Sequence, residues 1–305
     1  MQTFKTLLLR EWMQHQRGWL VLLALPLLLV LGFGLFGEVH LDLRDDGGVD
    51  AVPPLGVAMV TILGAGGLSL VLAWMAALLQ APGLARRDVQ DRSIEFWLSL
   101  PISHTQGVGA PLLMHLVLWP WIALLAGLAA GTLGSLLTVA QAYGPGAWFA
   151  LPWTALLPAV ALLALRLMLG TLLATLWLSP LILGTMAASA WLKRWGLPVV
   201  VGAVIGGGLL LERLYGMTWI WDTLRLLGTR ASQALMVADR SGDGPHGFVI
   251  EHGDEIAGAL SAMPGWLLHD AGQALLLLAS PAFAAALAGG ALAFGALWLR
   301  RARGA

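Results

Sequence analysis

The chain has 305 residues, of which 58% are hydrophobic and only 11% are charged. Soluble domains are about 45–50% apolar and about 25% charged, so this composition excludes an ordinary soluble domain and predicts a protein whose outer surface meets lipid. The formal net charge is zero, and the absence of cysteine excludes disulfides, thiolate metal sites and cysteine nucleophiles.

The first seventeen residues have the pattern of an amphipathic helix. Apolar side chains recur at helical spacing from Phe4 to Trp12, and Lys5 and Arg17 add charge. Two interpretations remain open. Residues 1–17 form either a separate helix along the cytoplasmic surface of the membrane or an extension of the first transmembrane helix.

Six apolar runs follow along the chain, and crossing a bilayer takes about 20 such residues. The runs cover residues 18–37, 55–79, 108–137, 167–191, 197–211 and 272–299. The fifth run is short, so its ends are the least defined. The predicted fold class is therefore an all-α integral membrane protein, with six transmembrane helices in a single domain over residues 18–305.

The chain around the fourth run is ambiguous. Residues 151–165 are also apolar, but they contain Pro152 and Pro158 and are followed by Arg166. They form either a re-entrant or interfacial segment or the start of a very long fourth helix, and the sequence favours neither. Within the run itself, Pro180 predicts a kink.

Residues 212–270 form the longest segment outside the runs, and we predict that they are external. Apolar residues from Ile220 to Leu235 make one helical stripe, which predicts a surface helix. The few ionisable residues within or beside the runs are Arg166, Glu212 and His115. We expect their side chains to reach the interface, which leaves the membrane interior without the charge relay of an ion-driven transporter.

Lysine and arginine collect in four segments that alternate with the runs. These are the N-terminal segment, residues 80–107, the turn with Lys193 and Arg194, and the C-terminus from Arg300. Six spans place all four on one side of the membrane, and cytoplasmic flanks are those enriched in lysine and arginine. Both termini are therefore predicted to be cytoplasmic, while most acidic residues fall on the opposite side.

No pattern typical of catalysis or metal binding is present. The chain has no phosphate-binding G-x-x-x-x-G-K-[ST] loop and no H-E-x-x-H, and its seven histidines are scattered. We therefore predict no enzyme activity, no metal ligands and no bound cofactor, so that any ATP must bind to another chain. Two GxxxG pairs, Gly127 with Gly131 and Gly202 with Gly206, are assigned to packing within the chain.

The cytoplasmic segment 80–107 is the most informative part of the chain. Residues 87–103 read RDVQDRSIEFWLSLPIS, in which mixed charges precede an apolar group and Pro101 ends the run. A short helix with one charged and one apolar face can lie against the membrane and present its charges to a cytosolic partner.

The run RSIEFWLSLPIS resembles the intracellular segment of permeases of the ABC-2 type. In that family a charged stretch leads into glutamate, large apolar residues, Leu-Ser-Leu-Pro and then Ser or Thr. The matching residues are Glu95, Phe96, Leu98, Ser99, Leu100, Pro101 and Ser103. A basic residue usually follows, and here it is His104. The resemblance extends to the N-terminal helix and the six spans.

The resemblance implies the permease subunit of an ATP-driven exporter in the bacterial inner membrane, which moves a hydrophobic or amphipathic substrate by alternating access. Its implied partners are two cytosolic ABC ATPase subunits that bind ATP and Mg, a second permease copy and membrane lipids, but no nucleic acid. The residues that it assigns to ATPase coupling are Arg86, Arg87, Asp88, Asp91, Arg92, Ser93, Glu95, Phe96, Trp97 and Leu98. The alternative is a non-transporting membrane sensor or assembly protein that is coupled mechanically to an ATPase.

Overall fold

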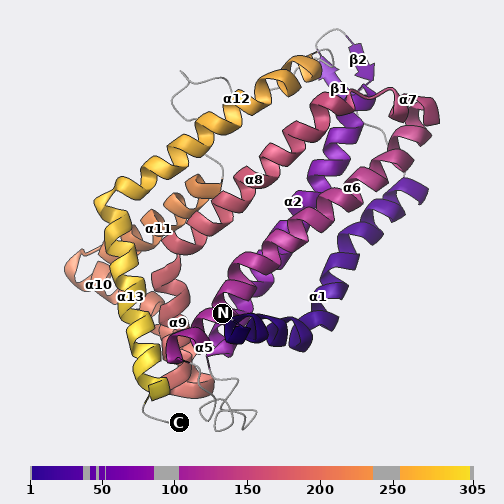
Figure 1. Ribbon diagram of the computed structural model, residues 1–305. Helices are drawn as coiled ribbons and strands as arrows, with labels where there is room; N and C mark the ends of the chain where they lie inside the picture. The colour runs from indigo at the N-terminus through magenta and orange to yellow at the C-terminus, as the bar shows by residue number, and fades with distance from the viewer. Residues whose placement is uncertain are drawn as a thin grey trace.

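The computed structural model is helical over most of its length (Figure 1). It describes residues 2–36, 42–45, 48–51, 53–85, 103–235 and 255–302. The predicted all-α class is confirmed, and the described chain adds one small ladder, in which the strands β1 (Asp42–Asp45) and β2 (Gly48–Ala51) pair antiparallel in the connection after the first helix. This short ladder pairs backbone polar groups that lie outside any helix.

The described helices form six successive passes along the molecule, of which the fifth ends midway along α8 (Trp153–Trp177) (Figure 1). The first three passes are α1 (Gln2–Phe36), α2 (Pro54–Leu84), and a rod of α5 (His104–Leu113), the π-helix η1 (Met114–Leu118) and α6 (Trp119–Tyr143). The last three are each made of two helices: α8 with α9 (Ser179–Leu192), α10 (Gly196–Tyr215) with α11 (Trp219–Leu235), and α12 (Glu255–Leu276) with α13 (Pro281–Ala302). The short helices α7 (Pro145–Phe149), η2 (Lys193–Trp195) and η3 (Leu277–Ala279) lie in connections.

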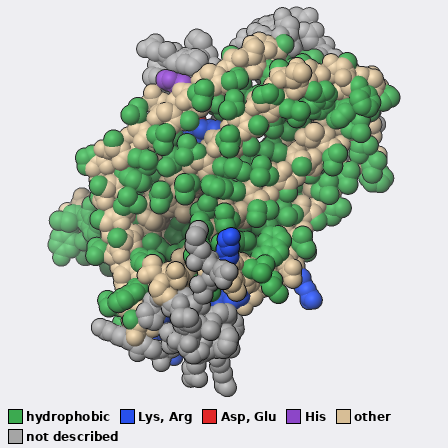
Figure 2. All heavy atoms as spheres, viewed as in Figure 1, with side chains coloured by type: hydrophobic (Ala, Val, Ile, Leu, Met, Phe, Trp, Pro, Cys, Tyr) green, Lys and Arg blue, Asp and Glu red, His purple; other side chains and the backbone are tan. Residues whose placement is uncertain are grey.

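Six helical stretches of the described chain are long and apolar enough to cross a membrane. They are Phe4–Gly32, Pro54–Ala85, Thr105–Tyr143, Trp153–Trp177, Ser179–Tyr215 and Pro281–Ala302. The number of stretches agrees with the six predicted spans. The stretch Ser179–Tyr215 is not straight but is bent into the hairpin α9–α10, in which Gly196 packs against the backbone of Ser189. The outer face in Figure 2 is largely hydrophobic, as a multi-pass membrane protein requires.

The predicted boundaries of the first two spans need correction. Helix α1 is continuous from Gln2 to Phe36, so the predicted amphipathic helix runs directly into the first span, and its position on the membrane surface stays a prediction. Figure 1 shows the first part of α1 lying across the end of the molecule that holds both termini before the helix turns along the bundle. Helices α2 and α5 continue into the predicted cytoplasmic segment, because apolar residues extend α2 to Leu84 and the Ser103 hydroxyl caps the polar start of α5.

The ambiguity before the fourth span is settled by α8. This helix begins at Trp153 and includes Pro158 and Arg166, so residues 151–165 are the start of a long helix and not a re-entrant segment. The predicted run 167–191 is nevertheless divided at Leu178, because Pro180 lies in the first turn of α9, where its missing N–H is tolerated.

The predicted sixth span, residues 272–299, is also divided. Helix α12 ends at Leu276, and α13 begins at Pro281. The hydroxyl of Ser280 accepts a hydrogen bond of 3.2 Å from the backbone N–H of Phe283, which caps the start of α13. Hydropathy alone missed the break because the residues on both sides of it are apolar.

The predicted external segment 212–270 contains two helices, α11 and α12, that are not among the six stretches apolar enough to cross a membrane, and its place outside the membrane stays a prediction. Helices α11 and α12 both pack against α8, which is itself apolar enough to cross a membrane. The stripe on α11 is present, but Leu227 and Ala231 bury it in a cluster with Leu173 and Trp177 of α8. An amphipathic helix buries its apolar face wherever an apolar partner is available. Residues 236–254 of this segment lie outside the described residues.

The helices α2 and α6 form the most extensive helix contact of the described chain, and glycine makes it close. Gly127 packs against Ser69, and a Cβ atom on Gly131 would lie 2.7 Å from the Cα atom of Ile62. This GxxxG pair therefore packs within the chain, as predicted. The pair on α10 does not, because no described atom lies within 4 Å of the Cβ positions of Gly202 and Gly206.

Candidate functional site

The basic helix ends of the described chain meet at one end of the molecule. Gly107, near the start of α5, packs against the guanidinium of Arg301 at the end of α13. His15 of α1, the end of α2 and the cationic turn η2 border one pocket. In Figure 1 this end also holds both chain termini. The described parts of the four basic segments thus share one end, which is the arrangement expected from their alternation with six spans. The side of the membrane that this end faces stays a prediction.

The ten residues assigned to ATPase coupling fall within residues 86–98, which lie outside the described residues. The described chain stops at Ala85 after α2 and resumes at Ser103, whose hydroxyl accepts a hydrogen bond of 3.2 Å from the backbone N–H of Gln106 and caps α5. The segment is therefore attached at both ends to the basic end of the bundle. Its roles stay predictions.

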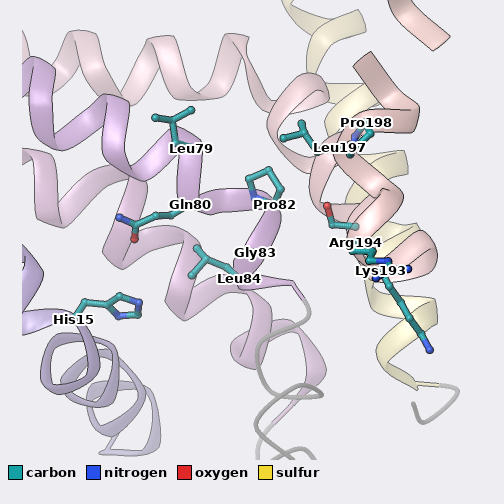
Figure 3. Close-up of a pocket in the computed structure, with 11 residues that line it drawn as sticks. His15, Leu79, Gln80, Pro82, Gly83, Leu84, Lys193, Arg194, Leu197 and Pro198 are labelled. Carbon is teal, nitrogen blue, oxygen red and sulfur yellow. The ribbon is translucent and has the colours of Figure 1, made fainter. Parts of the chain in front are cut away.

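A pocket of about 480 Å³ opens at this end between α1, α2 and the α9–α10 hairpin. Figure 3 shows His15 on one side, Leu79 and Gln80 of α2 along the wall, and Lys193 and Arg194 of η2 on the other side. Two cations beside apolar walls can accommodate an amphipathic molecule with a negatively charged group. The positive φ of Lys193, 54°, marks the sharp reversal that brings η2 to the pocket.

Glu11, His15 and His115 form a cluster beside this pocket. Glu11 and His15 are one turn apart on α1, and His115 comes from η1 in the third pass. The side chains of Glu11 and His115 are both 0% exposed, and His115 Nε2 lies 3.5 Å from Glu11 Oε2. The other carboxylate oxygen, Oε1, accepts a hydrogen bond of 2.6 Å from Arg10 Nη2.

Two stacked tryptophans lie beside the cluster, and one of them contacts both histidines. The rings of Trp19 and Trp119 stack with centroids 4.6 Å apart, and Trp19 also stacks on His15 at 5.4 Å. His115 lies edge-on to both Trp19 and His15, at 5.1 and 4.5 Å. These contacts keep the imidazoles in an apolar surrounding, where a polar atom without a partner is costly.

A buried ion pair lies midway along α8. Arg166 Nε donates a hydrogen bond of 2.6 Å to Asp270 Oδ2 of α12, and Arg166 Nη1 donates one of 2.9 Å to the carbonyl of Ala234 in α11. The side chains of Arg166 and Asp270 are only 2% and 3% exposed. The expectation that Arg166 and His115 reach the interface is therefore wrong, because both are enclosed by neighbouring helices.

Sequence reasoning missed both buried groups. The only local signal for the first is the Glu-x-x-x-His spacing of Glu11 and His15 on one helix face, and His115 is a hundred residues further along the chain. Asp270 was assigned to the external segment.

Comparisons of this chain with protein-family models, curated proteins and solved structures found no match. The function is therefore argued from the structure and the residue pattern.

Proposed function

We propose that this chain is the permease subunit of an ATP-driven exporter of the ABC-2 type, embedded in a bacterial inner membrane. One observation carries the proposal: residues 86–102 connect the ends of two adjacent helical rods at the basic end. These residues contain most of the RSIEFWLSLPIS run. A cytosolic ATPase that binds this segment acts on both rods at once.

The two rods form a stiff lever. Helix α2 enters the segment, the α5–η1–α6 rod leaves it, and the two pack closely along the bundle through Gly127 and Gly131. Closely packed elements move as rigid bodies and not by continuous bending. A displacement at the basic end is therefore carried to the opposite end of the molecule, as alternating access requires.

The charge distribution supports an external source of energy. The buried ionisable residues of the described chain are Glu11, His115, Arg166 and Asp270, and they form two separate groups. Arginine stays protonated, so the pair Arg166–Asp270 cannot pass a proton along a relay. The chain also lacks a phosphate-binding loop, so a partner must bind and hydrolyse ATP with Mg.

The pocket and the open face of α10 fit the same proposal. Apolar walls with Lys193 and Arg194 at one side suit an amphipathic substrate that enters from the cytoplasmic leaflet. Gly202 and Gly206 leave a small-residue face on α10 without a neighbour in the described chain. Such a face allows close approach of another transmembrane helix, in keeping with a second permease copy.

Charge reversal in the coupling segment tests the proposal. The permease should copurify with its ATPase, and the triple variant Arg87→Glu, Asp91→Lys, Arg92→Glu should lower substrate flux per ATP hydrolysed by at least about tenfold, because like charges across an interface cost several kcal/mol. Flux and hydrolysis are measured together in proteoliposomes.

The matched control is Arg225→Glu on α11, whose side chain is 79% exposed and lies outside the coupling segment. It should leave the flux per ATP unchanged. Wild-type coupling in the triple variant would refute the assignment of residues 86–98. ATP hydrolysis that responds to substrate without any flux would instead favour the non-transporting sensor.

A further inference from the structure

The cluster of Glu11, His15 and His115 contains a buried imidazole without hydrogen-bond partners. Both ring nitrogens of His115 lack a partner, although the side chain is fully buried. Its Nε2 points to Glu11 Oε2 at 3.5 Å, which is longer than a hydrogen bond. Buried polar atoms are rarely left unpaired, and those that are need an explanation.

The other two side chains each offer one ligand atom close to His115. His15 Nδ1 lies 3.1 Å from the carbonyl oxygen of Glu11. Because a carbonyl only accepts, Nδ1 is the donor in this contact, and Nε2 is the ring nitrogen that would bind an ion. Arg10 Nη2 donates to Glu11 Oε1 at 2.6 Å, and Glu11 Oε2 lies 3.5 Å from His115 Nε2. Such outer partners orient the ligands of metal sites.

We propose that Glu11, His15 and His115 form a binding site for a divalent transition-metal ion of the Zn²⁺ class. One ligand atom from each side chain lies within 4.8 Å of the others. Zinc bonds of about 2.0–2.2 Å place tetrahedral ligands roughly 3.4 Å apart, so the side chains close on the ion by about 1 Å. Two imidazoles and one carboxylate suit such an ion, whereas Ca²⁺ and Mg²⁺ require oxygen ligands.

The surroundings of the cluster fit a metal site in two further respects. His15 also lines the 480 Å³ pocket, which gives an ion a path from the solvent to the ligands. His115 belongs to η1, and π-helical segments within α-helices occur frequently at functional sites. The bound ion joins α1 to the third pass at the basic end of the molecule.

Metal titration of the purified full chain tests this site, after removal of any histidine tag. Calorimetry should show one Zn²⁺ bound per chain, and Co²⁺ should produce a visible absorption band that Zn²⁺ removes. His115→Gln and His15→Asn should each weaken Zn²⁺ binding by more than about 100-fold. Loss of a residue that only orients a ligand costs up to about 100-fold in metal affinity, and loss of a ligand itself should cost more. The control is His269→Gln, which replaces an exposed histidine of α12 and should bind as the wild type does.

Two results would overturn the site. One is a wild-type chain that binds no equivalent of Zn²⁺ at micromolar concentration, and the other is a His115→Gln chain that binds as tightly as wild type with unchanged helix content by circular dichroism. If His115→Gln does not fold, His15→Asn decides the question, because His15 is only partly buried. None of these measurements depends on transport.

Discussion

Arg166 and Asp270 show how single side chains bind distant parts of this chain together. The two residues are 104 positions apart, and Ala234, which also accepts from Arg166, is 68 positions from it. Taking both charges out of solvent costs several kcal/mol per ion, which their attraction and hydrogen bonds offset. Because one guanidinium satisfies groups on α11 and α12, it sets the positions of both helices along α8.

Removal of one partner should therefore be far more damaging than removal of both. Asp270→Ala should destabilise the protein by about 3–5 kcal/mol, because it leaves the Arg166 charge buried without its carboxylate. The double variant Arg166→Met, Asp270→Leu should recover most of this loss, since no buried charge remains. Thermal unfolding in detergent, followed by tryptophan fluorescence, provides the double-mutant cycle.

An exposed ion pair serves as the control. Asp222 and Arg225 on α11 lie 3.9 Å apart, and their side chains are 59% and 79% exposed. Asp222→Ala should leave the unfolding temperature nearly unchanged, because solvent screens such pairs. If Asp270→Ala were as stable as the wild type, the pair would not hold α8, α11 and α12 together.

At the scale of helices, the same Gly-x-x-x-Gly spacing has two different outcomes. On α6, Gly127 and Gly131 allow the backbone of α2 to approach, and a side chain at either position would collide with it. On α10, Gly202 and Gly206 face no described atom. The motif alone is therefore no guide to its partner, which depends on where each helix lies in the bundle.

Alanine substitution should separate these two faces. Gly131→Ala places a Cβ atom 2.7 Å from the Cα atom of Ile62, so α2 and α6 must move apart at a cost of about 1–3 kcal/mol. Gly202→Ala meets nothing within 4 Å, and alanine favours a helix by about 1 kcal/mol over glycine. Unfolding midpoints should fall for the first variant and stay equal or rise for the second. Equal losses at both positions would contradict the packing described for α6.

At the scale of the whole molecule, six passes and four basic segments produce a polar end and an apolar body. The outer face of the body is largely hydrophobic, and most of the lysine and arginine side chains visible in Figure 2 lie toward the end that holds the termini. Cytoplasmic flanks of membrane proteins are enriched in these residues. The basic end is therefore expected to face the cytoplasm, where an ATPase would bind.

Cysteine labelling tests this orientation directly, because the natural chain has no cysteine. A membrane-impermeant maleimide added to intact cells should label Phe149→Cys on α7, an exposed position at the opposite end of the molecule. It should not label Lys193→Cys on η2 until the membrane is opened. The reverse pattern would place the basic end outside and refute a cytoplasmic coupling segment.

The two candidate sites differ in how far they could be predicted. The coupling segment is a continuous run of sequence, so its charges, apolar residues and Leu-Ser-Leu-Pro pattern are visible without a structure. The cluster of Glu11, His15 and His115 joins α1 to η1, and nothing in the sequence near His115 indicates the other two. Its discovery required the packing of the first pass against the third.

Hydropathy and charge by themselves predicted a membrane protein with six passes and with its basic segments at one end. They could do so because hydropathy and local charge are both read from short windows of neighbouring residues. The tertiary structure decided where the last three passes break and which helices fill the predicted external segment. It also decided that Arg166 meets Asp270 inside the bundle. Each of these depends on contacts between residues far apart in the chain, where a local pattern carries no information about the partner.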